Sequence, residues 1–424
     1  MKNFLNKIFF RSNNLEYISQ NIKDLTYNTP AERIFNSINS FSSKSEIRYV
    51  GGCVRKIINN EKVDDIDLAT NLEPKQVCDV LLKNNINFYE SGIEHGTITA
   101  IIDDHKFEIT TLRRDVFTDG RHAKVKFSED WKEDALRRDF TFNSIYSNKD
   151  GNLFDPFNGK KDLENGEVNF IGDANKRVKE DYLRILRYVR FFQNYSKQPH
   201  NQDVIRSLKM NLNGVLKLSK DRLFDELKKI IQINTLEKLT KDKISLDLIL
   251  MIFPELKNLK IFSKLSDSSK YILKRKDFIF LLSLLVIDDT DNVDYFLFKY
   301  SVSKKNQKRI KNIHNFYKEK INSKTFTKNN INKIFYYYGR EATLDILDYR
   351  MIKLNKVDNS IKELIDHYNK REIPKMPVNA DLLIKKYEIS EGRQLGEKLK
   401  IIEEEWVKNN FKISDQQVDN IINN

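Results

Sequence analysis

Residues 47–70 read IRYVGGCVRKIINNEKVDDIDLAT, and the rest of the N-terminal half extends the pattern they begin. The pattern predicts a strand at residues 47–50, a tight turn at Gly51-Gly52 and a helix at residues 54–59. Residues 65–69 are again extended. Two later runs rich in Ile and Thr, 97–102 and 106–112, are joined by a short polar link that predicts a hairpin. Together these segments predict an α+β domain.

The C-terminal half has a different pattern. After Gly172 glycine and proline become scarce, and apolar residues recur at spacings of three and four, as in residues 182–192 and 223–231. This periodicity predicts a mostly helical remainder. The stretch 195–203, around Pro199, is predicted to be a loop.

Composition excludes several classes of protein. The chain has 424 residues, 40% of them hydrophobic, which is enough to form several domains with real cores. Its two cysteines, Cys53 and Cys78, have no ligand-like spacing, which argues against a zinc or disulfide framework. The longest apolar run, residues 278–287, is about half of a membrane span. We therefore expect no membrane partner and a cytoplasmic location, with organellar targeting by residues 1–30 left open.

Positive charge is concentrated in the second half of the chain. Residues 1–200 contain 31 Lys and Arg against 30 Asp and Glu, whereas residues 201–424 contain 43 against 31. A polyanion such as RNA would be attracted to the basic half by counterion release. The alternative is a solvated, Lys-rich surface that reflects biased composition.

Asp65 and Asp67 are candidate metal ligands. Alternate residues of a strand share a face, so both carboxylates should point the same way and suit Mg²⁺ bound together with substrate phosphates. An Asp-x-Asp pair alone is more often a surface turn. Glu108, on the second hairpin strand, either completes this acidic site or is an exposed strand residue. Upstream, the turn at Gly52 and the cation of Arg55 suit a triphosphate, although Gly-Gly also occurs for turn geometry alone.

Two later segments supply further charged candidates. In residues 136–143, LRRDFTFN, Asp139 could orient Arg138 toward a sugar or phosphate, or form a plain salt bridge with it. In residues 180–191, EDYLRILRYVRF, a charged residue recurs at every third position from Asp181, which predicts a single charged stripe on a helix. Its members are Asp181, Arg184, Arg187 and Arg190.

The charged stripe suggests nucleotide recognition. Arginines in series destabilise a helix unless an anion lies against them, and a triphosphate would serve. A carboxylate accepts from an exocyclic amino group while a guanidinium donates to the adjacent ring nitrogen. Asp181 with Arg184 would therefore select C and A over U and G.

Taken in order, these motifs resemble a known family. GGCVRK, DDIDLAT, EHGTITAIIDDHKFEITTLRRD, DGRHAKVKF, RRDFTFNSI, DPFNGKKDL and EDYLRILRYVRF are similar to class II nucleotidyltransferases of the polymerase-β superfamily, which comprise tRNA CCA-adding enzymes and bacterial poly(A) polymerases. The strong match covers about residues 47–192. Weaker similarity follows in LSKDRLFDELKKII and near the C-terminus.

The resemblance implies a fold and a division of the chain. It implies a head with a five-stranded mixed sheet, followed by an all-helical neck, body and tail. The expected boundaries are an N-terminal extension at 1–30, the catalytic head at 31–165, the neck with the base pocket at 166–230, the body at 231–350 and the tRNA-binding tail at 351–424.

It also implies an activity and its residues. CTP and ATP would supply a CCA end to tRNA with release of pyrophosphate, and two Mg²⁺ ions would be held by Asp65 and Asp67. Gly52, Arg55 and Arg138 match triphosphate- and nucleotide-contacting positions, and the charged stripe matches the base- and phosphate-contacting helix. Lys56 departs from the family, which usually has Asp there, and this puts the ion pairing around Arg55 in doubt.

Two alternatives to CCA addition remain. One is addition of A alone. Residues 113–127 match the flexible loop that the family needs for the final A, and Glu94-His95-Gly96-Thr97 stands where we expect a poly(A) polymerase signature, so CCA addition is favoured. We expect His95 to have a structural role. The other alternative is a catalytically inactive RNA-binding protein, against which intact Asp65 and Asp67 argue.

Overall fold

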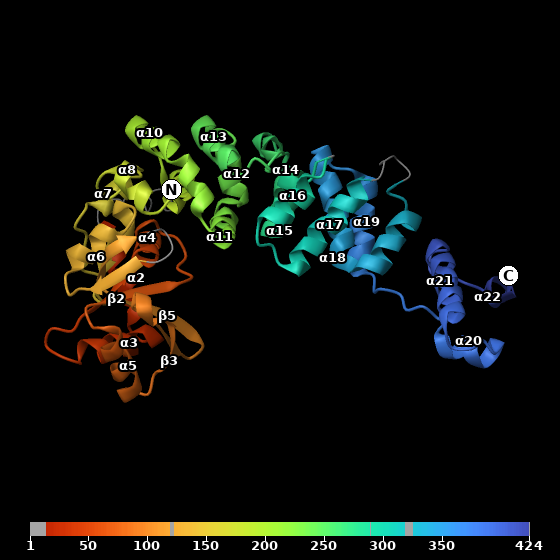
Figure 1. The fold of residues 1–424 in the computed structure, drawn as a ribbon, viewed down its shortest axis with the longest axis horizontal. Coiled ribbons are helices and arrows are strands. Elements are labelled where there is room, and N and C mark those ends of the chain that lie inside the picture. Colours follow the sequence, from red (N-terminus) through yellow and green to blue (C-terminus); the bar gives the residue numbers. More distant parts are fainter. Residues whose placement is uncertain (1–13, 119–122, 289, 319–324, 424) are drawn as a thin grey trace, which may run out of the picture. The chain divides into compact units, whose positions relative to one another are not determined.

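The computed structural model describes residues 14–118, 123–288, 290–318 and 325–423, and the chain divides into two compact units, 1–222 and 223–424. All the described strands lie in the first unit, and the described part of the second unit contains only helices as regular elements (Figure 1). The α+β head followed by a helical remainder is confirmed. The finer domain boundaries stay a prediction.

A mixed sheet forms the centre of the first unit. Its strands are β1 (Ile47–Val50), β2 (Ile66–Thr70), β3 (Asn87–Gly92), β4 (Thr97–Ile102), β5 (His105–Thr111), β8 (Tyr146–Ser147) and β9 (Leu153–Phe154), in the order β3-β4-β5-β2-β1-β8-β9. Only the β2–β5 pair is parallel among these described strands. The prediction of five strands is wrong, because β8 and β9 have two residues each and are too short to show an alternating pattern.

The local predictions hold to within a few residues. The Gly-Gly turn leads into α4 (Gly52–Ile58), two residues earlier than expected. The β4–β5 hairpin turns at Asp103 and Asp104, whose φ angles of 47° and 64° are both left-handed. Two consecutive left-handed residues match the twist of a two-residue hairpin, and Asp tolerates that conformation.

Helices and a small second sheet surround this core. They are α2 (Asn14–Thr26), α3 (Pro30–Asn39), α5 (Pro74–Lys83), η1 (Ile93–His95), the two-stranded sheet β6 (Arg113–Thr118) and β7 (Ala123–Phe127), α6 (Trp131–Arg137), η2 (Thr141–Asn143), α7 (Gly159–Asn165), α8 (Ala174–Glu180), α9 (Leu183–Tyr195), α10 (Gln202–Met210) and η3 (Leu212–Lys217). The predicted loop at 195–203 lies between α9 and α10.

Helix α2 forms most of the described part of the N-terminal extension. Ile18 and Ile22 on it are fully buried, and Thr26 Oγ1 lies 2.8 Å from the hydroxyl of Tyr49 on β1. Residues 1–13 lie outside the described chain. The described part of the extension is therefore packed as part of the first unit.

An aromatic cluster packs α9 against Phe140, Phe142 and Phe170. Phe191 lies edge-on to Phe140 and Phe142, with ring centroids 5.3 Å apart in both pairs, and Tyr188 stacks on Phe170. Buried aromatic pairs of this kind contribute about 1 kcal/mol each beyond burial. They fix the face of α9 that presents arginines to the head.

Helices joined by loops make up the described part of the second unit. Its helices are α11 (Lys220–Ile230, beginning in the first unit), α12 (Ile233–Leu239), α13 (Lys243–Ile252), η4 (Leu259–Ser263), α14 (Asp267–Leu273), α15 (Phe278–Val286), α16 (Asn292–Lys299), α17 (Lys304–Lys318), α18 (Lys328–Leu354), α19 (Asn359–Lys370), α20 (Ala380–Tyr387), α21 (Arg393–Lys408) and α22 (Asp415–Asn423). The longest apolar run forms most of α15, which is almost entirely buried. None of the helices in the described ranges has the length and hydropathy needed to cross a bilayer.

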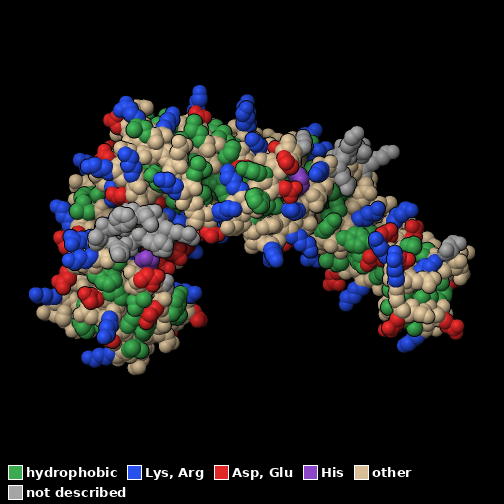
Figure 2. Space-filling view, viewed as in Figure 1, with side chains coloured by type: hydrophobic (Ala, Val, Ile, Leu, Met, Phe, Trp, Pro, Cys, Tyr) green, Lys and Arg blue, Asp and Glu red, His purple; other side chains and the backbone are tan. Residues whose placement is uncertain are grey.

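The basic residues of this unit are distributed over its helices. The basic run at residues 304–311 lies at the start of α17. On the face drawn in Figure 2, Lys and Arg side chains are spread among acidic ones and do not form one patch. Binding of tRNA by this half stays a prediction.

Candidate active site

Three carboxylates lie at the parallel pair of strands in the centre of the sheet. Asp67 is the second residue of β2, and its register partner across the parallel pair is Glu108 on β5. Asp65 precedes β2 by one residue, so the alternation of an extended chain places it on the same side as Asp67. We call Asp65, Asp67 and Glu108 the acidic edge.

The electrostatics of the acidic edge favour a cation. Burial, and then the neighbouring charge of Asp65, raise the pKa of Asp67, while Arg138 and Arg55 oppose the shift. Burial also raises the pKa of Glu108, and the charges of Asp67 and Asp65 add to it. No Lys or Arg of the described chain forms an ion pair with these three side chains. Like charges that lack a partner are stabilised by a bound hard cation.

The donor set suits magnesium bound together with a substrate. Within the described ranges, no group of three or more His, Cys, Asp and Glu side chains is close enough to hold a metal by itself. Mg²⁺ usually takes one or two protein carboxylates and completes its shell with water and substrate phosphates. Asp65 and Asp67 fit that pattern, and Glu108 stands beside them rather than completing a cage.

The Gly-Gly turn borders the acidic edge. Gly51 has a φ of +66°, which favours glycine, and a Cβ there would lie 3.4 Å from Nη1 of Arg138. A Cβ on Gly52 would lie 3.7 Å from Oδ2 of Asp67 and 3.8 Å from Nη2 of Arg55. The turn therefore brings backbone close to both a carboxylate and two arginines.

Arg55 is held in an aromatic cage. Its Nε donates to the Tyr195 hydroxyl at 3.2 Å, its Nη1 donates to Oδ1 of Asn143, and its guanidinium lies 4.8 Å from the Phe191 ring centroid. Lys56, the departure from the family, pairs with Asp64 at 3.1 Å instead. Polar and aromatic groups, not an adjacent Asp, therefore fix Arg55.

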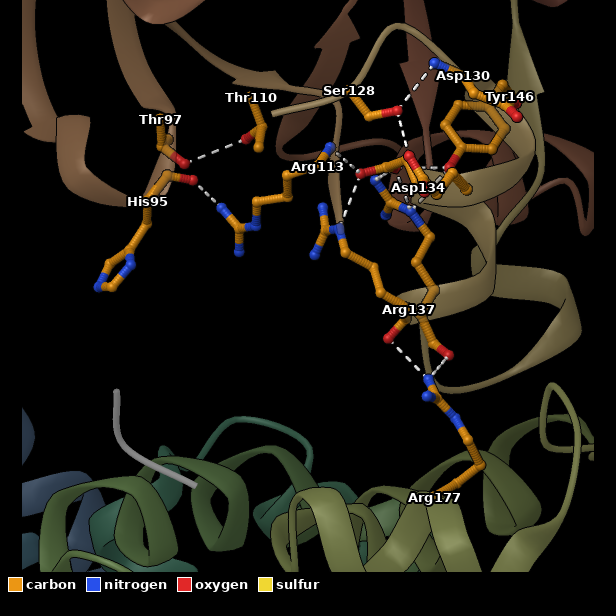
Figure 3. Close-up of polar contacts among 12 residues, drawn as sticks. His95, Thr97, Thr110, Arg113, Ser128, Asp130, Asp134, Arg137, Tyr146 and Arg177 are labelled. Atoms are coloured by element: carbon orange, nitrogen blue, oxygen red, sulfur yellow. Dashed lines mark hydrogen bonds and ion pairs between the residues drawn. The ribbon is translucent and has the colours of Figure 1, made fainter. Parts of the chain in front are cut away.

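Arg138 is oriented by Asp134, and this differs from the expectation. Nη2 of Arg138 lies 3.0 Å from Oδ2 of Asp134, which also accepts a hydrogen bond from the Tyr146 hydroxyl at 2.7 Å. Nε of Arg137 donates to the other oxygen of Asp134 at 2.8 Å (Figure 3). These partners hold the pKa of the buried Asp134 carboxyl well below its usual range, although burial opposes them.

Asp139 pairs with Arg187, so its expected pairing with Arg138 is wrong. Both Nε and Nη2 of Arg187 lie 2.6 Å from Oδ2 of Asp139, and Nδ2 of Asn143 donates to Oδ1 at 2.8 Å. Against the cost of burial, chiefly the charge of Arg187 lowers the pKa of Asp139 to about 2. The pair joins the segment after α6 to α9.

The predicted charged stripe is wrong at its first member. Asp181 has an extended backbone between α8 and α9, and its side chain accepts from the backbone N–H of Leu183 at 3.1 Å and pairs with Nη2 of Arg222 at 2.7 Å. Arg187 and Arg190 do lie on α9 with Arg184. Asp181 caps the helix rather than belonging to it.

Arg184 is buried and held by groups of the protein itself. Its Nη1 lies 2.6 Å from Oε2 of Glu180 and 2.7 Å from the carbonyl oxygen of Arg177. The anion that the arginine series requires is therefore supplied, for Arg184 and Arg187, by the carboxylates of Glu180 and Asp139. The inference that a triphosphate is needed to stabilise this helix is wrong for those two residues.

Residues near the expected loop are ordered at its base. Nη1 of Arg113 donates to the backbone carbonyl of His95, and the Arg113 N–H donates to Asp134 at 3.3 Å (Figure 3). A Cβ on Gly96, whose φ is +81°, would come within 2.8 Å of the Phe127 ring. Residues 113–118 and 123–127 form a β-hairpin, and 119–122 lie outside the described chain.

Sequence reasoning missed three side chains at this site. Asp134 carried a signal, because its spacing of four from Arg138 is that of a helical ion pair. Arg177 carried the same kind of signal for Glu180, three residues on, but none for the carbonyl oxygen of Arg137, 40 residues away. Arg222 carried none for Asp181, 41 residues away.

Family models agree with this architecture. The model described as "Poly A polymerase head domain" matches residues 47–169, and the one described as "tRNA nucleotidyltransferase domain 2 putative" matches residues 273–418. The Bacillus stearothermophilus CCA-adding enzyme, solved in complex with CTP, superposes with a TM-score of 0.69 at 20% identity over 92% of this chain and 95% of that one. The fold is therefore that of a CCA-adding enzyme.

Protein relatives extend the match along the chain. The human "CCA tRNA nucleotidyltransferase 1, mitochondrial" is 34% identical over 379 residues, covering 88% of this chain and 85% of the human protein. The CCA-adding enzyme of Streptococcus uberis is 28% identical over 380 residues, covering 86% and 89%. The chain belongs to the CCA-adding tRNA nucleotidyltransferase family, whose members use divalent metal ions.

Proposed function

We propose that this protein adds C, C and A to the 3′ end of tRNA, taking the nucleotides from CTP and ATP and releasing pyrophosphate. The mammalian relatives are named for CCA addition, and solved neighbours hold CTP, tRNA or an ATP analogue. The observation that carries the proposal is the acidic edge, where Asp67 and Glu108 are register partners with Asp65 on the same side.

We infer that Asp65 and Asp67 hold two Mg²⁺ ions together with the phosphates of the nucleotide. Bound there, the ions would favour the ionised form of the attacking hydroxyl and neutralise charge on the phosphates. The unpaired carboxylates of the acidic edge support this assignment.

The remaining residues of the acidic edge and the turn act on the reacting groups. The 3′-oxygen of tRNA forms a bond to the α-phosphorus, the bond to the β-phosphate oxygen breaks, and pyrophosphate leaves. We propose that Glu108 accepts the hydroxyl proton, since its raised pKa suits a base better than an ordinary carboxylate does. Gly52, Arg55 and Arg138 bind the triphosphate beside it.

Nucleotide choice is assigned to the neck. Asp181 accepts from the amino group of C or A, Arg184 donates to the adjacent ring nitrogen, and Arg187 with Arg190 contact phosphates. The surrounding hydrogen bonds support this because they fix Asp181 and Arg184 before a nucleotide arrives. The basic second half binds the tRNA backbone.

Replacing the acidic edge tests the catalytic proposal. With labelled CTP and tRNA lacking its CCA end, Asp65→Asn should reduce incorporation by about a thousandfold or more, because the ion loses a charged ligand. Asp64→Asn is the matched control, since Asp64 is exposed and pairs with Lys56. Undiminished incorporation by Asp65→Asn would support the inactive RNA-binding alternative.

Product length tests the nucleotide order. CTP alone should extend the truncated tRNA by two residues, and ATP should then add one. Extension by ATP without CTP would instead indicate the A-only polymerase.

Replacing Arg184 tests base selection. Arg184→Ala should lower the preference for CTP over UTP by about tenfold or more, since each unpaired buried polar group costs about 1–3 kcal/mol. Binding of tRNA, measured by filter retention, should not change. An unchanged preference would remove Arg184 from base selection.

Cellular location is a separate question. The mitochondrial names of the mammalian relatives make residues 1–30 a candidate organellar address, against the cytoplasmic expectation. A fusion of residues 1–30 to a fluorescent protein would distinguish the two. Ile18 and Ile22 are buried, so a cleavage that preserves the fold must fall before α2.

A further inference from the structure

Arg177 joins the neck to the end of the helix that precedes Arg138. It lies on α8, and its Nη2 donates to the carbonyl oxygen of Arg137 at 2.7 Å and to that of Arg138 (Figure 3). The last carbonyls of a helix have no partner within it. Arg177 therefore caps α6 at the residues that carry the proposed triphosphate contact.

The guanidinium groups of Arg177 and Arg184 contact the same groups of the protein. Nη1 of Arg177 and Nη1 of Arg184 lie 2.5 and 2.6 Å from the same oxygen of Glu180. Arg184 also donates to the carbonyl oxygens of Arg177 at 2.7 Å and of Arg137 at 3.3 Å. The position of Arg184 is thus defined largely by groups that Arg177 also holds.

This arrangement is costly to form. The side chains of Arg177 and Arg184 are each 11% exposed and have one carboxylate oxygen between them. Burial, and then the charge of Arg184, lower the pKa of Arg177. Its Nε is buried without a hydrogen-bond partner in the described part of the protein. Because such groups oppose folding, a role in placing other side chains explains them better than stability does.

We propose that Arg177 is a positioning residue for nucleotide selection, which fixes Arg184 on one side and the backbone of Arg138 on the other. This rests on the proposed base-reading role of Arg184. A guanidinium can donate to two carbonyls and a carboxylate together, whereas a lysine ammonium cannot match that fork. Without it, Arg184 keeps its charge and loses its fixed place.

Arg177→Lys tests the proposal in the full-length enzyme with tRNA lacking its CCA end. The ratio of kcat/KM for CTP to that for UTP should fall about tenfold to a hundredfold, as for loss of a good base contact. Affinity for tRNA should stay within about twofold, since the phosphate contacts that dominate it are untouched. Arg206→Lys is the matched control, because Arg206 forms an exposed pair with Asp203 in the same unit.

Chemical rescue separates positioning from a loss of folding. Added guanidinium ion at non-denaturing concentration should restore the CTP preference of Arg177→Ala, whereas methylammonium should not. If guanidinium raised the turnover of CTP and UTP equally, or if neither Arg177 variant changed the ratio, the role would be structural and the proposal overturned.

Measuring the same CTP-to-UTP ratio for Arg184→Ala distinguishes a failure of the positioning role from a failure of base reading. If it lowers the ratio and Arg177→Lys does not, the positioning role alone fails. If Arg184→Ala leaves the ratio unchanged, base reading fails and the positioning role fails with it. If both lower it, the double variant should be no less selective than Arg184→Ala, because Arg177 acts through Arg184.

Discussion

The acidic edge and the arginines at the end of α6 and on α9 are built in opposite ways. Asp67 and Glu108 have raised pKa values and no ion-pair partner in the described chain. Arg138, Arg184 and Arg187 are each paired with a carboxylate at 3.0 Å or less. We call these three arginines, with their carboxylate partners, the arginine web. The acidic edge carries negative charge without an ion-pair partner in the described chain, whereas each arginine of the web is paired with a carboxylate of the protein.

The difference follows from what each region must do. A metal site needs carboxylates whose charge is uncompensated, because the cation provides the compensation. Selection of a base needs donors already fixed in space, since disorder would allow the wrong partner to be accommodated. The acidic edge is therefore expected to lower stability, whereas the Asp134–Arg138 and Asp139–Arg187 pairs of the web are expected to raise it.

The largest expected effect comes from breaking the web. Asp139→Asn should destabilise the protein by about 3 kcal/mol, because it removes the carboxylate charge that compensates the partly buried Arg187. The measurement is the midpoint of chemical unfolding followed by circular dichroism. Asp203→Asn, at an exposed pair, should change it by less than about 0.5 kcal/mol. Equal effects of the two variants would contradict the comparison.

Lowering the pH should affect the acidic edge before it affects the arginine web. Asp139, with a pKa of about 2, adds stability that is complete above the unfolded value of about 4 and is lost as pH falls through 2. Asp67 and Glu108 have raised pKa values and take up protons at higher pH than Asp139 does, which removes a proposed metal ligand and the proposed base first. Incorporation should therefore disappear while the circular dichroism spectrum is still native.

A variant shows whether the loss of incorporation at low pH comes from protonation of the protein or of the nucleotide. Glu108→Gln removes one titrating carboxylate and its repulsion of Asp67, so the acid limb of its residual activity should move to lower pH. Simultaneous loss of activity and fold in the wild-type protein would show that the two regions do not differ in this way.

The smallest expected effect is a gain in stability. Asp67→Asn removes a charge whose burial opposes folding, so with EDTA present it should stabilise the protein by about 1 kcal/mol. Added Mg²⁺ and CTP should stabilise the wild-type protein and reverse the order, because ligand binding favours the folded state. Destabilisation by Asp67→Asn in EDTA would mean that the carboxylate has a structural role.

Sequence reasoning succeeded where the signal is local. The alternation around Asp65 and Asp67, the Gly51-Gly52 turn and the hairpin at Asp103 each depend on neighbours within a few residues. Their backbone preferences therefore predicted β1, β2 and the β4–β5 pair correctly.

It failed where the partners are distant. Asp139 was expected beside its neighbour Arg138, but the fold brings Arg187 to it from 48 residues away. Asp181 was placed on the helix because the spacing of three continues through it, yet its pairing with Arg222 accompanies an extended backbone. Periodicity alone cannot distinguish the first turn of a helix from its cap.

The sequence by itself determined the class of fold, the family and the shared face of Asp65 and Asp67, because alternation along a strand fixes which of its carboxylates share a face. Only the tertiary structure decided that Glu108 lies beside Asp67, that Asp139 holds Arg187 and that Asp181 holds Arg222. The Asp139–Arg187 pair joins the segment after α6 to α9, where Phe191 packs against Phe140 and Phe142. Arg187 is 48 residues from its partner and Arg222 is 41 residues from its own, and residue spacing does not predict such pairs.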